Sequence, residues 1–205
     1  MKKIFLGLFA SLLLTACAAY APQAAAQTKT WQEAYAELLR DYAEQKQDNL
    51  MFFILHDIDM DGVPELIIAG EYADEIYDAA YVFRNGKAMP LKFDEGVYIA
   101  GFALSARAGV VPNPNNAPGL TTYIRGAAGQ FGSDALYWRV VIDGDRLIID
   151  TRGEIRVDLT TGYTHFYIEN TTATEEDFFR VFGRWEWLPY FRITEDNINE
   201  VIFGG

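Results

Sequence analysis

Four acidic side chains crowd into one nine-residue segment of the chain, residues 57–65, which reads Asp-Ile-Asp-Met-Asp-Gly-Val-Pro-Glu. The carboxylates fall at the first, third, fifth and ninth positions of this segment, and a glycine stands at the sixth. Calcium is a hard cation that takes roughly six to eight oxygen ligands, and alternate side chains of a tight loop can all point toward one ion. The spacing therefore predicts a calcium-binding loop.

The predicted ligands are four carboxylates and one backbone carbonyl oxygen, contributed by Asp57, Asp59, Asp61, Val63 and Glu65. Gly62 would allow the sharp turn that such a loop needs. The alternative is a plain acidic hairpin, in which the aspartates form Asx turns and Asp61-Gly62 makes the corner. A turn needs one or two acids, whereas this segment has four, and this difference favours calcium.

The residues that flank the acidic segment decide which kind of calcium loop it is. An EF-hand needs a bidentate glutamate at its twelfth position and a helix on each side, but position twelve here is Ile68 and the apolar flanks predict strands. The segment instead resembles the strand–loop–strand calcium hairpins of integrin-type FG-GAP repeats, which end in an acid at position nine. The resemblance covers one short segment and implies an ion site, not a propeller fold.

The N-terminus carries a second signal. Lys2 and Lys3 precede an apolar stretch that is too short for a membrane span and is typical of a secretory signal. Residues 14–17, Leu-Thr-Ala-Cys, resemble the lipobox of bacterial lipoproteins. The resemblance implies a signal peptide over residues 1–16, a lipid on Cys17, a flexible tether over residues 17–29 and an extracytoplasmic protein anchored to the membrane. The alternative is ordinary cleavage near residues 24–26, which would remove Cys17.

Composition restricts the classes of partner. The formal net charge of −12 argues against a nucleic-acid partner, which needs a lysine- and arginine-rich surface. Half of the residues are hydrophobic, so residues 30–205 are expected to form a single globular domain with a full core. More loosely, the order of the segments is similar to that of small uncharacterised bacterial lipoproteins: a tether, a helix with Trp31 and Tyr35, the acidic hairpin and a closing helix that begins near Ile193. That resemblance would cover the whole chain, and it implies no activity.

Turn and capping signals predict an α+β fold. Thr30 and Glu33 form a capping box that starts a helix running to about residue 47. Asn85-Gly86, Asp143-Gly144 and Thr161-Gly162 mark hairpins of an antiparallel meander, flat or curled toward a barrel. Thr174 and Thr194, each followed by acids, predict two C-terminal helices. The expected fold is an antiparallel sheet with helices at both ends of the chain.

Two other functions stay open at this point. A surface module for a glycan or a protein would use the proline- and asparagine-rich stretch 110–119, expected to be a long exposed loop, and the aromatic residues Trp187 and Tyr190. A hydrolase would need His56 or His165 beside a nucleophile or paired acids, and no motif predicts such an arrangement. The sequence favours a binding protein over an enzyme.

Overall fold

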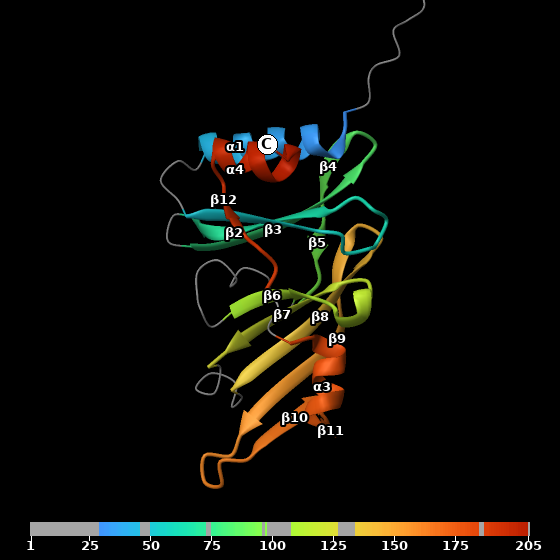
Figure 1. Ribbon diagram of the computed structural model, residues 1–205, viewed down its shortest axis with the longest axis vertical. Coiled ribbons are helices and arrows are strands. Elements are labelled where there is room, and N and C mark those ends of the chain that lie inside the picture. The colour runs from blue at the N-terminus through green and yellow to red at the C-terminus, as the bar shows by residue number, and fades with distance from the viewer. Residues whose placement is uncertain are drawn as a thin grey trace, which may run out of the picture.

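The computed structural model describes residues 29–45, 50–72, 75–95, 97, 108–126, 134–184 and 187–204. Within these ranges, two mainly antiparallel sheets follow one another along the long axis of the molecule (Figure 1). The helices are α1 (Trp31–Gln45), α3 (Glu175–Phe182) and α4 (Glu195–Phe203), with a short 3-10 helix, η2 (Pro114–Asn116). The α+β class expected from the sequence is confirmed. Cys17 and the predicted signal peptide lie outside the described residues.

The first sheet has five strands, and the first and last helices of the described chain pack on it. In spatial order they are β12 (Phe191–Arg192), β1 (Met51–His56), β2 (Glu65–Tyr72), β3 (Glu75–Arg84) and β4 (Lys87–Pro90). Helices α1 and α4 cover its outer face (Figure 1). Arg40 of α1 forms an ion pair of 2.7 Å with Glu195 of α4, so the C-terminal helix is attached to the N-terminal one.

The second sheet has seven strands. Along the sheet they are β11 (Thr171–Ala173), β10 (Thr164–Ile168), β9 (Arg146–Val157), β8 (Ala135–Asp143), β7 (Leu120–Arg125) and β6 (Ala108–Pro112). The seventh, β5 (Lys92–Phe93), pairs in parallel with β9. Over the described residues, neither sheet closes into a barrel, which settles the shape that the sequence pattern left open.

Local chemistry accounts for the ends of these elements. The capping box of α1 is present: the Glu33 backbone N–H donates to Thr30 Oγ1, and the Thr30 N–H donates to Glu33 Oε2 at 2.8 Å. Thr174 and Thr194 cap α3 and α4 through their side chains, as predicted. Asn85 and Gly86 both have positive φ angles, which the tight turn between β3 and β4 requires.

Two sequence predictions need correction. The turn between β8 and β9 is formed by Gly144 and Asp145, because Asp143 still pairs with Arg146; the predicted turn was one residue too early. The stretch 110–119 is not an exposed loop over its whole length. Its first residues belong to β6, and Asn113 is only 5% exposed. In the part of the chain that the structure describes, no helix has the length and apolar character that a membrane crossing requires.

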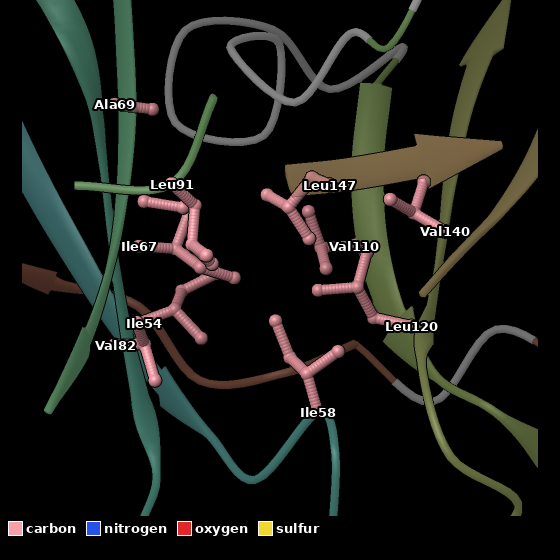
Figure 2. Packing of buried hydrophobic residues seen from close by; sticks show 11 residues of the cluster. Ile54, Ile58, Ile67, Ala69, Val82, Leu91, Val110, Leu120, Val140 and Leu147 are labelled. Atoms are coloured by element: carbon pink, nitrogen blue, oxygen red, sulfur yellow. The ribbon is translucent and has the colours of Figure 1, made fainter. Parts of the chain in front are cut away.

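The core that joins the two sheets is the part of the fold that matters for the site. Figure 2 shows side chains of the first sheet, among them Ile54 and Ile67, pointing toward Val110, Leu120 and Leu147 of the second. Ile58, from the predicted calcium loop, reaches into the same cluster and has no exposed surface. A fixed position for this loop therefore depends on both sheets.

Candidate metal centre

The acidic segment forms the connection between β1 and β2, two buried neighbouring strands of the first sheet. His56 at the end of β1 pairs with Glu65 at the start of β2, so the segment between them closes on itself. Met60 and Gly62 have positive φ angles of 64° and 89°. No heavy atom lies within 4 Å of a Cβ built on Gly62, so glycine is required here by the backbone conformation and not by lack of space.

Each aspartate of the loop uses one carboxylate oxygen to hold the backbone. Asp57 Oδ2 accepts the Gly62 N–H at 2.9 Å, and Asp59 Oδ1 accepts the Asp61 N–H at 3.2 Å. Asp61 Oδ1 accepts the Val63 N–H at 2.7 Å. These bonds keep the loop in shape without using the second oxygen of any of the three side chains.

The same three aspartates come together in space. Asp57, Asp59 and Asp61 each offer one ligand atom, and these atoms all lie within 4.8 Å of one another. Asp57 Oδ1 is buried and has no hydrogen-bond partner among the described residues. A buried carboxylate oxygen without a donor costs free energy unless a cation or a proton compensates it. These three carboxylates are a group that could hold a metal ion.

Glu65 takes a position that the sequence did not predict. Its side chain is 1% exposed, and its Oε2 accepts the Ile58 N–H at 2.7 Å. It lies outside the group of three aspartates whose oxygen atoms meet. Burial, followed by the negative charges of the three aspartates, raises the pKa of Glu65 to about 8, although the Ile58 N–H acts in the opposite direction. Without a cation this carboxyl group therefore favours its protonated form at neutral pH.

The negative charge of the loop is not balanced by basic side chains of the described ranges. None of the four acidic residues of the loop takes part in an ion pair there, whereas exposed acids such as Glu195 and Asp145 do. The carboxylates of Asp57, Asp59 and Asp61 lie near one another without a counter-charge, and like charges repel. A divalent cation would remove this repulsion and would use the oxygen atoms that the backbone bonds leave over.

The loop is also attached to the second sheet. The Gly119 N–H, which immediately precedes β7, donates to the Ile58 carbonyl oxygen at 2.6 Å. His56 Nε2 lies 3.3 Å from the Gly119 carbonyl oxygen, and burial lowers the pKa of His56. This contact of His56 with Gly119 joins the end of β1 to the second sheet.

Asn113 is a site-supporting residue that the sequence did not reveal. Its Nδ2 donates to the Pro118 carbonyl oxygen at 2.5 Å, and its Oδ1 accepts from the Thr121 hydroxyl at 3.1 Å. These bonds hold the stretch that includes Asn113 and Pro118 in place. A hollow of about 240 Å³ lies beside the loop, lined by His56, Asp57, Met60, Pro112, Asn113, Asn116 and Ala117. The many prolines and asparagines of this stretch were the only available signal, and they indicate a turn but not its partner.

The remaining predicted residues have different outcomes. The Val63 N–H donates to Asp61 Oδ1 within the loop. The role of Val63 as a ligand through its carbonyl oxygen stays a prediction. His165 is exposed on β10. Trp187 and Tyr190 are partly exposed, at 42% and 41%.

Comparisons with protein-family models, with curated proteins and with solved structures find no significant match to this chain.

Proposed function

We propose that the loop of residues 57–65 binds one calcium ion, and that the ion stabilises the protein without taking part in chemistry. The observation that carries the proposal is Asp57 Oδ1, which is buried without a hydrogen-bond donor from the described residues and belongs to one of the three aspartates that each place an oxygen within 4.8 Å of the others. Asx turns account for one oxygen of Asp59 and one of Asp61. Neither these turns nor the bond from the Gly62 N–H to Asp57 Oδ2 accounts for the buried Asp57 Oδ1.

The position of the loop indicates what the ion would stabilise. Ile58 packs in the core between the sheets, and its carbonyl oxygen accepts the Gly119 N–H. An ion that holds the loop would therefore also hold the junction between the two sheets. Calcium suits this role because its coordination shell tolerates a loop whose oxygens come from side chains of different length.

The setting that we propose for this domain is the extracytoplasmic side of a bacterial membrane, with a lipid anchor on Cys17. The support is the lipobox-like sequence of residues 14–17 and the charged and apolar segments before it. Extracellular calcium modules bind with dissociation constants of about 10⁻⁴–10⁻³ M, so a weak structural site would be occupied in that environment.

The test is thermal unfolding of the full-length protein in calcium and in chelator. At about 1 mM calcium, linkage predicts about 0.4–1.4 kcal/mol of added stability. For a protein of this size, this corresponds to a rise of roughly 1–5 °C in melting temperature. The Asp59→Asn variant should fold equally well in chelator, because an asparagine oxygen can still accept the Asp61 N–H, but it should lose the response to calcium.

The matched control is Asp41→Asn, which removes an exposed carboxylate of α1 and should keep the full calcium response. If the unmodified protein shows no change with calcium, the loop is an acidic hairpin held by Asx turns and the proposal is wrong. If Asp59→Asn and the unmodified protein respond equally to calcium, the ion binds somewhere other than this loop.

A further inference from the structure

The second sheet has one face covered by α3 and one face that α3 does not reach. On the covered face, Phe178 packs edge-on against Tyr137 of β8 and tilted against Phe166 of β10. A Cβ on Gly153 of β9 would come within 2.4 Å of the Phe182 ring, so the helix sits directly on that strand. Because side chains alternate between the faces of a strand, the neighbours of these residues lie on the opposite face.

The opposite face carries a hollow of about 410 Å³. Its side chains come from β8, β9, β10 and the turn that follows: Trp138, Arg152, Glu154, Tyr167, Glu169 and Asn170. This volume lies within the range of about 300–1,000 Å³ that is typical of small-molecule sites. No residue of the acidic loop lines it, so this hollow is distinct from the candidate metal centre. Its Trp138 also packs against the core between the sheets.

Strand register places aromatic residues on both sides of a polar strand. Trp138 of β8 is the direct partner of Arg152 of β9, and Tyr167 of β10 is the direct partner of Glu154. With strands about 4.8 Å apart, β8 and β10 lie about 10 Å from each other. The hollow therefore has a floor of charged groups on β9 and an aromatic side chain on each of the flanking strands.

The polar groups are held in place before any ligand arrives. The Glu154 carboxylate accepts two hydrogen bonds from Arg156, at 2.7 and 2.6 Å, and its side chain is only 14% exposed. The Arg156 guanidinium carbon lies 4.8 Å from the centre of the Tyr167 ring. Arg156 therefore orients both the Glu154 carboxylate and the Tyr167 ring. Glu169 Oε1 accepts the Arg152 N–H at 2.5 Å, which ties the turn to β9.

Unlike these residues, Arg152 has a guanidinium group without a partner among the described residues. Over the described part of the chain, this side chain forms neither an ion pair nor a hydrogen bond, while its backbone is fully used by Glu169. An arginine side chain has five N–H donors. The hollow thus offers an unused donor group beside carboxylate acceptors and aromatic rings.

We propose that this hollow binds a neutral saccharide. A sugar ring has an apolar C–H face, which an aromatic ring can cover, and hydroxyl groups around its rim, which need donors and acceptors such as Arg152, Glu154 and Asn170. The two arginines and two glutamates around the hollow balance in charge, and the protein has a formal net charge of −12. These charges disfavour an anionic ligand and suit a neutral one.

The test is isothermal titration calorimetry of the full-length protein with four tetrasaccharide probes. Chitotetraose, cellotetraose and maltotetraose are neutral, and tetragalacturonate is anionic. We expect at least one neutral probe to bind, with affinity unchanged by chelator, because the hollow is separate from the calcium loop. Arg152→Gln and Tyr167→Ala should each weaken that binding at least tenfold.

Arg192→Gln is the matched control, since it removes an exposed guanidinium of β12 in the first sheet and should leave the affinity unchanged. Arg152 is exposed, and its side chain holds no other described residue in place, so its variant should keep the melting temperature of the unmodified protein. The proposal is overturned if no neutral probe binds, if only tetragalacturonate binds, or if the two hollow variants bind as tightly as the control. None of these results depends on whether the loop of residues 57–65 binds calcium.

Discussion

Gly119 and Ile58 are joined by a backbone hydrogen bond of 2.6 Å, although about 60 residues separate them along the chain. The donor immediately precedes β7 of the second sheet, and the acceptor lies within the acidic loop of the first. Because the Ile58 side chain also packs in the core between the sheets (Figure 2), this residue connects the candidate ion site to the packing of the whole protein.

Replacement of Gly119 by alanine should strongly destabilise the protein. Gly119 has a φ angle of +101°, and a Cβ there would lie 2.4 Å from the Val140 carbonyl oxygen. Backbone strain and overpacking together should lower the free energy of unfolding by at least about 2 kcal/mol. The measurement is urea unfolding, with and without calcium.

Gly144→Ala is the control for this prediction. Gly144 also has a positive φ angle, +61°, but a Cβ added there would have no heavy atom within 4 Å. Its replacement should cost only the conformational penalty of about 1–2 kcal/mol. In addition, Gly119→Ala should reduce the stabilisation by calcium, and Gly144→Ala should not. Equal effects of the two variants on calcium binding would contradict a link between Gly119 and the loop.

Ile58→Ala should destabilise the protein even though the residue lies in a loop. Ile58 has no exposed surface and packs against both sheets, so its truncation leaves a cavity that should cost about 2–5 kcal/mol. Leu159→Ala is the comparison, since Leu159 is 93% exposed in the turn after β9 and its loss should change stability by less than about 0.5 kcal/mol. Chemical denaturation of both variants checks the prediction, and similar unfolding midpoints would refute it.

The calcium-free protein should lose stability as the pH rises from about 4.5 to about 8. The pKa of Glu65 is raised to about 8 by burial and by Asp59, Asp61 and Asp57, so the folded state keeps a proton that the unfolded state releases from about pH 4.5 upward. This single group can change the free energy of unfolding by at most about 1.4 kcal/mol per pH unit. Melting in chelator across this range measures the effect.

Glu65→Gln tests the origin of this pH dependence. Its neutral side chain can still accept the Ile58 N–H, so the variant should show a flatter profile between pH 4.5 and 8. In the unmodified protein, calcium should stabilise more at about pH 8 than at about pH 5.5, because a cation at the three aspartates would favour the ionised form of the nearby Glu65 and a proton on Glu65 would oppose it. A calcium effect independent of pH would count against Glu65 as part of the site.

Cys17→Ala should release the protein from the membrane. The lipobox-like residues 14–17 predict that Cys17 carries the lipid, and no other cysteine occurs in the chain. In a bacterial expression host, labelled palmitate should be incorporated into the unmodified protein and not into the variant. The melting temperature of the two proteins should agree within error, since the lipid would lie outside the folded domain. Labelling of the Cys17→Ala protein would disprove this site of modification.

The sequence by itself was sufficient for the local features. The capping box at Thr30 and Glu33, the Asn85-Gly86 turn and the caps at Thr174 and Thr194 depend on residues only a few positions apart, and the structure has all of them. The convergence of Asp57, Asp59 and Asp61 belongs to this class, because the spacing of a tight loop determines it.

Only the tertiary structure decided what these local features contact. The bond between Gly119 and Ile58 and the pairing of Trp138 with Arg152 depend on how strands distant in sequence align, and a shift of one residue would turn every side chain to the other face. The burial of Glu65 has the same origin, since β2 lies between β1 and β3 in the middle of the first sheet. Short-range spacing thus determined that the three aspartates of the loop converge. Long-range strand pairing determined how deeply the loop is buried and what it contacts.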